Sequence, residues 1–334
     1  MTSPAMIRAG IPLPGGRLVE IARDAGLPVL FSANAFMRRN ELGEITSVRT
    51  VDRAHFGGLN AALDSGGFVA ASKYFGFPWS IDQYLNLVES YDWSWYASMD
   101  HCVEPEIAGD KAGVMFRVAE TVRMFSALRR AAADRGLPPP MPVLQGWTPA
   151  QYVYCADKLP LLEWPELIGI GSMCRRNLHG EVGVFAVLDT LDRILPPHTR
   201  VHLFGVKGRS MQHLGQHPRI ASIDSLAWDF AARKEHPTGR TMDLRGQFML
   251  DWVSKNRAAA AGTQVSRTAS LLPVEAEEVD EHMGAWLDLI TGNEIDGPNP
   301  AWHAEQGFEQ LFPDEDQDEE GGEENPSEST FAPA

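Results

Sequence analysis

The chain has 334 residues, of which 44% are hydrophobic, 22% are charged and nine are Trp, a composition typical of a globular protein. No apolar run approaches the roughly 18 residues of a membrane span, and the N-terminus lacks the segments of a signal or transit peptide, so we expect a cytoplasmic protein with no membrane partner. The three cysteines, Cys102, Cys155 and Cys174, are far apart, which argues against a disulfide framework and against a cysteine-rich zinc site.

The formal net charge of −16 at pH 7 is unevenly distributed along the chain. Nine acidic residues and no basic residue lie between positions 314 and 328. Such a segment is typical of a disordered, solubilising tail, or of a polyanion that competes with nucleic acid for a basic groove. The overall acidity therefore does not exclude a nucleic-acid substrate, because a local basic face can supply phosphate contacts.

Along the chain, short apolar runs that predict strands alternate with longer patterns that predict helices, which indicates repeated βα units and a mostly parallel sheet. The predicted strands are 28–36, 60–65, 93–103, 142–147, 167–173, 201–206 and 220–228, with an eighth around 5–13 that contains Gly and Pro. The predicted helices are 80–91, 110–136, 148–159, 180–195, 243–262 and 275–293.

Eight βα units within residues 1–262 favour a single-domain (β/α)8 TIM barrel over an open doubly wound sheet. No GxGxxG turn follows the first strand, which also argues against a dinucleotide-binding fold. We expect residues 263–312 to form a helical extension that packs on the barrel, and residues 313–334 to form the acidic disordered tail.

Polar residues stand at the carboxyl ends of the predicted strands, where barrel enzymes place their catalytic groups. These residues are Asp64, Asp100, Gln145, Gly171, Ser172, Lys207, Arg209 and Asp224. A carboxylate such as Asp100 matches the N1–H and NH₂ donors of a guanine-like base, an amide matches its O6 acceptor, and Phe68 can stack on its face. Asp64 and Asp224 would then act at a glycosidic carbon, one as nucleophile and the other in proton transfer, without a metal.

Six short motifs carry a resemblance to a known superfamily. They are "LDSGGF" (63–68), "SMDHCVE" (98–104), "VLQGW" (143–147), "GIGSM" (169–173), "HLFGVKG" (202–208) and "SIDSLAWDFAAR" (222–233). In order and spacing they resemble the tRNA-guanine transglycosylases, barrel enzymes that replace a guanine base with a 7-deazaguanine through a covalent Asp-sugar intermediate. The resemblance implies that Asp224 is the nucleophile, Asp64 the general acid/base and Phe68 the stacking ring. It also implies that Asp100, Gln145, Gly171 and Ser172 bind the base.

The chain departs from the tRNA enzymes in several places. It has no CxCxxC zinc group after the nucleophile strand, so no metal or other cofactor is expected. We also expect the residues after Gly262 to be too few for the RNA-binding C-terminal domains of the archaeal enzymes. Val69 replaces the Gln of the usual "DSGGFQ", and Asn177 stands roughly where the bacterial enzymes have a Glu that pairs with an aminomethyl cation. The second change favours a neutral 7-substituent such as a nitrile.

These features resemble most the deazapurine DNA modification protein A branch, the DNA-guanine transglycosylases of bacterial genomic islands and phages, in particular its short phage-type forms. The resemblance implies DNA, a 7-deazaguanine base such as 7-cyano-7-deazaguanine and other DNA-modification proteins as partners. It further implies protection of the DNA against restriction, and a host-cytoplasmic location for a phage-encoded protein. Because a duplex hides the glycosidic carbon, the target base must be flipped out. We expect Arg175, Arg176, Lys207 and Arg209 to contact the phosphates.

Three alternatives remain open on the sequence. The first is the same base exchange on tRNA, the second a non-catalytic barrel subunit that binds nucleic acid or a catalytic partner, and the third a glycoside hydrolase. The absent zinc motif argues against base exchange on tRNA, and the presence of both Asp64 and Asp224 argues against a non-catalytic subunit. A glycoside hydrolase would leave Asp100 and Gln145 unexplained.

Overall fold

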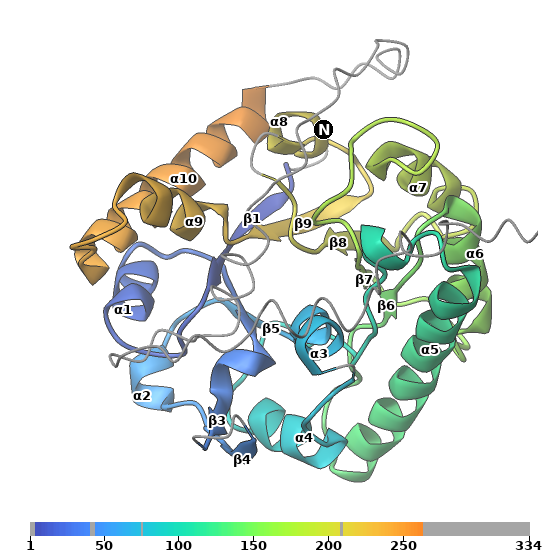
Figure 1. The fold of residues 1–334 in the computed structure, drawn as a ribbon, viewed down its shortest axis with the longest axis horizontal. Helices are drawn as coiled ribbons and strands as arrows, with labels where there is room; N and C mark the ends of the chain where they lie inside the picture. Colours follow the sequence, from blue (N-terminus) through green and yellow to red (C-terminus); the bar gives the residue numbers. More distant parts are fainter. Residues whose placement is uncertain (1–3, 41–43, 75, 208–209, 263–334) are drawn as a thin grey trace, which may run out of the picture. The chain divides into compact units, whose positions relative to one another are not determined.

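The computed structural model describes residues 4–40, 44–74, 76–207 and 210–262. Seven parallel strands form one curled sheet in the order β5-β2-β1-β9-β8-β7-β6, with helices arranged around its outside (Figure 1). The strands are β1 Met6–Ile11, β2 Val29–Ser32, β5 Ala61–Asp64, β6 Val143–Leu144, β7 Leu167–Ile170, β8 Arg200–Leu203 and β9 Ile220–Ser225. The segment predicted as a poor strand, around 5–13, is therefore a central strand that pairs with both β2 and β9.

The gap between the edge strands β5 and β6 is bridged by residues 95–98. Leu63 of β5 pairs in parallel with Tyr96, and Ala97 pairs in parallel with Met141 just before β6. The backbone N–H groups of Ala97 and Met141 donate to Leu63 and Tyr96, both at 2.8 Å. Residues 95–98 thus occupy the place of an eighth strand between β5 and β6, and the predicted TIM-barrel fold is confirmed.

The predicted strand 93–103 is wrong in extent, since only its middle joins the sheet. Beyond Ser98 the backbone makes other hydrogen bonds: the N–H of His101 donates to Thr121 Oγ1 at 3.0 Å, and the N–H of Val103 donates to Ser172 Oγ at 2.7 Å. Because these donors are used by side chains, they are not available to a strand ladder. The chain instead leaves the sheet and continues to the long helix α5, Lys111–Asp134.

Ten α-helices lie within the described residues. They are α1 Arg17–Asp24, α2 Arg53–Phe56, α3 Gly67–Tyr74, α4 Ile81–Glu89, α5 Lys111–Asp134, α6 Pro149–Lys158, α7 Val184–Leu191, α8 Met211–Leu214, α9 Ala227–Glu235 and α10 Met242–Gly262. Five correspond to predicted helices, and two of these begin with capping boxes, Ser80 with Gln83 and Thr148 with Gln151. The predicted helix 275–293, the extension 263–312 and the tail 313–334 lie outside the described residues.

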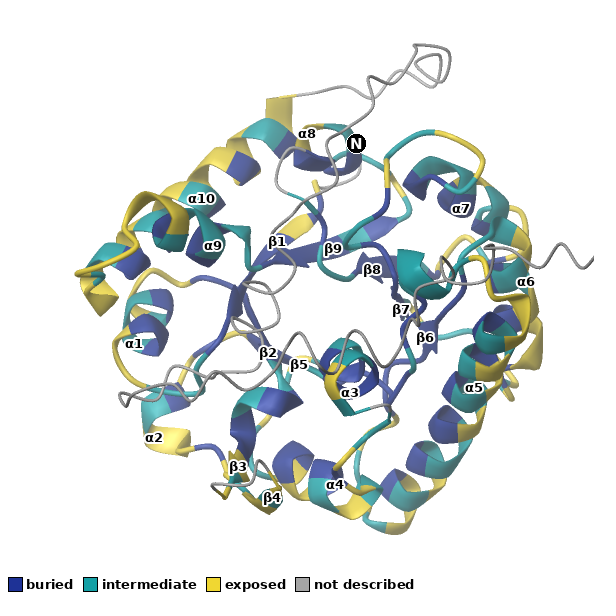
Figure 2. Ribbon diagram, in the orientation of Figure 1, coloured by how far each residue is buried: buried dark blue, intermediate teal, exposed yellow. Residues whose placement is uncertain are grey.

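The sequence patterns did not predict α1, α2, α3, α8 and α9, or the antiparallel hairpin of β3 Met37–Arg39 and β4 Ile45–Val48. Helices α2 and α8 have only four residues each and α3 begins at a glycine, so their local patterns are poor helix signals, whereas α1 has an amphipathic pattern that the prediction missed. The strands are mostly buried and the helices are buried on the face towards the sheet, as Figure 2 shows. No helix of the described chain is long and apolar enough to cross a membrane.

Candidate active site

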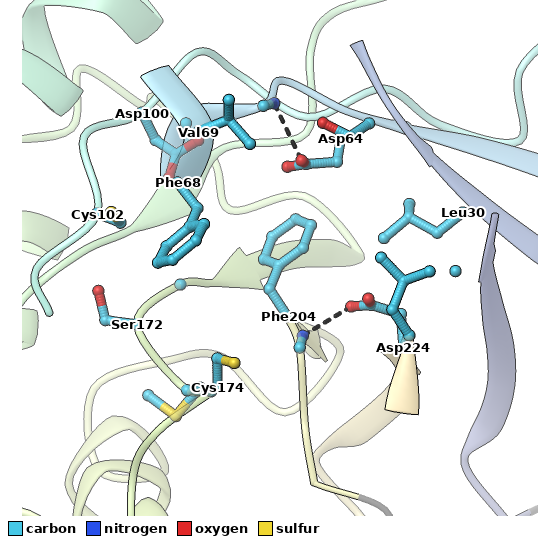
Figure 3. A pocket seen from close by; sticks show the side chains of 18 of the residues that line it. Leu30, Asp64, Phe68, Val69, Asp100, Cys102, Ser172, Cys174, Phe204 and Asp224 are labelled. Carbon is cyan, nitrogen blue, oxygen red and sulfur yellow. Dashed lines mark hydrogen bonds between the residues drawn. The ribbon is translucent and has the colours of Figure 1, made fainter. Parts of the chain in front are cut away.

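A pocket of about 920 Å³, open to solvent, lies at the carboxyl ends of the strands (Figure 3). Its lining includes every residue predicted to act on the base or the sugar, namely Asp64, Phe68, Asp100, Gln145, Gly171, Ser172 and Asp224. Residues up to 160 positions apart thus meet at one place, because parallel strands bring their carboxyl ends to the same edge of the sheet.

Asp64 is the last residue of β5. Its Oδ2 accepts a hydrogen bond from the backbone N–H of Gly66 at 3.0 Å, in a turn that Gly66 makes with a φ of 81° (Figure 3). Burial, and then the nearby carboxylate of Asp100, raises the pKa of Asp64 to about 8. At neutral pH this carboxyl group therefore holds a proton that it can give to a leaving group.

Asp224 lies near the end of β9 and is 8% exposed. Its Oδ1 accepts a hydrogen bond from the backbone N–H of Gly205 at 2.9 Å, in the loop that follows β8 (Figure 3). Arg8, on the neighbouring strand β1, is in register with Asp224. Burial lowers the pKa of Arg8 to about 10, and the Asp224 carboxylate opposes this lowering. Asp64 and Asp224 thus have different surroundings, as a proton donor and a nucleophile require.

A buried chain of hydrogen bonds joins Asp100, Gln145 and Ser172. Ser172 Oγ donates to Gln145 Oε1 at 2.6 Å, Gln145 Nε2 donates to Asp100 Oδ2 at 2.5 Å, and Ser65 Oγ donates to Asp100 Oδ1 at 2.7 Å. Burial raises the pKa of Asp100, while its bonds from Ser65 and Gln145 lower it. These hydrogen bonds fix the orientation of the Gln145 side-chain amide, with Nε2 as the donor towards Asp100. The Asp100 carboxylate has further lone pairs that can accept hydrogen bonds from a base.

The turn after β7 brings the backbone close to this network. A Cβ atom on Gly171 would overlap the Gln145 amide, and Ser172 has a φ of 58°, which is rare for a residue with a side chain. Tyr152 of α6 donates from its hydroxyl to the Gly171 carbonyl at 2.8 Å and holds the turn from behind. The turn therefore forms a close-fitting backbone wall of the pocket.

Two aromatic rings project into the pocket, one from Phe68 in α3 and one from Phe204 after β8 (Figure 3). The second ring was not predicted as a site residue, although it stands within the "HLFGVKG" motif. Two rings on one pocket suit a planar ligand, because a flat base can stack on both.

Glu104 is a further pocket residue, and its sequence position alone gave it no role. It lines the pocket, and burial raises its pKa to about 7, against a lowering by Arg175. Asn177, the position of the missing family carboxylate, is exposed. The pocket therefore contains the carboxyl group of Glu104, at a sequence position different from that of the Glu expected from the bacterial tRNA enzymes.

The predicted phosphate contacts are in different environments. Arg175 forms an ion pair with Glu106, and Lys207 follows β8 beside the pocket and is partly buried. Arg176 is only 4% exposed, donates to the carbonyls of Ser172, Trp147, Val182 and Gly146, and lies 4.4 Å from the ring centroid of Trp147. This position contradicts the predicted phosphate contact of Arg176, because its guanidinium is buried and already bound. Arg209 lies outside the described residues.

Among the described residues there is no group of three or more His, Cys, Asp or Glu side chains that could hold a metal ion. The expectation that no cofactor is needed stays a prediction.

A barrel with two carboxyl groups, Asp64 and Asp224, on one pocket is an arrangement that suits an enzyme acting at a glycosidic carbon. The sequence profile of the family DpdA, DeoxyPurine in DNA protein A, matches residues 19–276. Because the match spans more than half of the chain, the protein belongs to this family, and the predicted resemblance is confirmed. At family level the match supports a glycosyltransferase-type enzyme of DNA deazapurine modification, with DNA as substrate. No curated protein gave a match.

Proposed function

We propose that this protein exchanges guanine in DNA for a 7-deazaguanine through a covalent intermediate between Asp224 and deoxyribose. The observation that carries the proposal is the convergence of Asp64 and Asp224 on the same pocket as the Asp100–Gln145–Ser172 network. Two carboxyl groups suffice for glycosidic chemistry, and the network explains why the ligand would be a purine-like base rather than a sugar.

In the first half-reaction an oxygen of Asp224 attacks C1′ of the target nucleotide, and the bond from C1′ to the guanine nitrogen breaks. The departing electron pair stays on the guanine, which takes the proton of Asp64. In the second half-reaction the ionised Asp64 removes a proton from the incoming 7-deazaguanine. That base attacks C1′ and releases the Asp224 carboxylate, so both aspartates return to their starting states.

The same pocket would read both bases, because guanine and 7-deazaguanine share their hydrogen-bonding edge. Asp100 would accept from N1–H and NH₂, and the turn at Gly171 and Ser172 would close the edge of the site. For the 7-substituent we propose a nitrile, as in 7-cyano-7-deazaguanine. In its neutral form Glu104, with a pKa of about 7, could donate a hydrogen bond to the nitrile nitrogen.

The target guanine has to leave the duplex to reach Asp224. Arg175, Lys207 and Arg209 are the proposed phosphate contacts. For Arg175, DNA binding would require the phosphate to compete with Glu106. Replacement of DNA guanine in this way would protect the DNA from restriction enzymes.

The test is expression in a host that makes 7-deazaguanines, followed by digestion of DNA and tRNA to nucleosides and mass spectrometry. We expect a 7-deazaguanine deoxynucleoside in the DNA of cells with the wild-type protein. Asp224→Asn should abolish this product and the covalent protein–DNA adduct, with a loss of at least about 1,000-fold, since an amide is a poor nucleophile. Modified tRNA without modified DNA would contradict the DNA substrate, and an active Asp224→Asn variant would contradict the nucleophile.

A further inference from the structure

Inside the barrel, on its inner wall beside the nucleophile, lies a buried polar layer that no step of the proposed reaction uses. It consists of the buried residues Arg8 on β1, His202 on β8 and Ser222 on β9, with the partly buried Trp95 packed against them, and His202 has no solvent exposure. A buried imidazole is costly unless its two nitrogens find partners. The surroundings of His202 therefore need an explanation.

The two nitrogens of His202 face two different partners on β9. Nδ1 is 2.8 Å from Ser222 Oγ, with which His202 is in register, and Nε2 is 3.3 Å from Asp224 Oδ1. Within the described chain Nε2 has no well-aligned hydrogen bond, so the carboxylate is its closest acceptor. Since a carboxylate can only accept, the Ser222 hydroxyl donates to Nδ1 and the proton of a neutral His202 is on Nε2.

Electrostatics agree with a neutral imidazole. Burial lowers the pKa of His202, and the interaction with Asp224 opposes this lowering. The nearby guanidinium of Arg8 lowers the pKa further. Arg8 is itself held by Val29 O at 3.1 Å and by Asn60 Oδ1 at 3.1 Å. The layer thus supplies an N–H dipole from His202 and a fixed charge from Arg8 on one side of Asp224.

Packing holds the imidazole in this orientation. The ring of His202 lies between Trp95 and Phe204, with centroid distances of 4.8 Å and 4.6 Å, and Arg8 lies 5.4 Å from the ring of Trp95. Rotation of the imidazole would require these side chains to move, since the interior is closely packed.

We infer that His202 is a positioning residue for Asp224: with the N–H of Gly205 it holds Oδ1 and directs the other carboxylate oxygen, Oδ2, to C1′. The inference rests on the proposed function. Oδ1 accepts from Gly205 and faces Nε2, and no hydrogen bond to Oδ2 is made by the described residues. A carboxylate that can rotate freely would present its attacking oxygen in the right direction only part of the time, so fixing it speeds the attack.

The test compares His202→Phe and His202→Gln in a single-turnover assay of adduct formation on DNA. We expect His202→Phe to slow adduct formation about 10- to 100-fold, the effect of a hydrogen bond to a charged group if the 3.3 Å contact tightens in the transition state, with the KM for the free base changed by less than about 3-fold. His202→Gln replaces the Nε2–H with an amide N–H and should recover most of the rate. A merely structural histidine would not show this rescue.

Trp93→Phe is the matched control, because Trp93 packs against Phe31, Phe36 and Phe56 and makes no described ring contact with His202. It should leave adduct formation within about 3-fold of the wild type. Adduct formation at the wild-type rate in His202→Phe, no rescue by His202→Gln, or an equal loss in Trp93→Phe would each overturn the inference.

Nitrogen NMR of the imidazole separates this inference from the proposed function, because it needs no activity. We expect the Nε2–H tautomer in the wild type and a shifted Nε2 signal in Asp224→Asn. An Nδ1–H tautomer, or a signal that does not respond to Asp224→Asn, would overturn the contact. A wild-type protein with the expected signal but no adduct would instead overturn the proposed function and, with it, the positioning role.

Discussion

Asp64 and Asp224 are the same residue type at equivalent strand ends, and their environments make them chemically different. Asp64 accepts a hydrogen bond from one backbone N–H and has the Asp100 carboxylate as a neighbour. Asp224 instead has the backbone N–H of Gly205, the imidazole of His202 and the guanidinium of Arg8 around it. The raised pKa of Asp64 suits it to the proposed role of proton donor, and the polar and cationic neighbours of Asp224 suit that residue to the proposed role of nucleophile.

The pKa of about 8 at Asp64 predicts opposite pH dependences for the two half-reactions. Adduct formation needs protonated Asp64, so its rate should fall as the pH rises through about 8. Attack by the incoming base needs ionised Asp64, so its rate should rise over the same range. Single-turnover rates of each half-reaction across this range measure both effects.

Asp64→Asn is the control for this assignment. It should slow both half-reactions by about 100-fold or more and remove the pH step, while DNA binding is kept. A pH step near 8 that persists in Asp64→Asn would show that another group titrates there.

At the scale of elements, the site depends on the turns that leave the strands. The turns after β5, β7 and β8 use Gly66, Gly171 and Gly205 to bring backbone atoms against the functional side chains. Helix α3 starts so close to Asp100 that a Cβ on Gly67 would overlap the Asp100 backbone oxygen. These close approaches explain why glycines accompany the acidic residues in the motifs.

Gly171→Ala tests the turn after β7. The added methyl group would displace the Gln145 amide and break its bond to Asp100, so we expect the KM for the base to rise by about 10-fold or more. Gly109→Ala is the control, since a Cβ there meets no atom within 4 Å. Equal KM values for Gly171→Ala and the wild type in a base-exchange assay would contradict a base-reading role of the network.

The positions of most strands could be predicted because short apolar runs alternate with longer helix patterns, and so could the helices with capping boxes. The short strand at 95–98 and the helices α3 and α9 could not, because their limits depend on contacts across the barrel. The same holds for Arg176: next to Arg175 in the sequence it has the same chemistry, and only packing against Trp147 and Tyr152 makes it a buried residue.

At the scale of the whole molecule, the described part of the barrel ends with α10 at Gly262, and the match to the DpdA family ends at residue 276. Deletion of residues 314–334 removes the run of acidic residues and none of the described barrel. We expect the shortened protein to keep its melting temperature within about 2 °C and its adduct-forming activity. Circular dichroism melting and the adduct assay measure both, and loss of the fold would show that the acidic segment is structural.

The sequence by itself determined the class of fold, the family and the residues that converge on the pocket, because apolar periodicity and strand-end motifs are local signals. Only the tertiary structure decided the state of each group. The proton on Asp64, the pocket position of Glu104, the burial of Arg176 and the contact of His202 with Asp224 all depend on distances between strands that are far apart in the chain. Burial and neighbouring charge set these properties, and neither is encoded in a short stretch of residues.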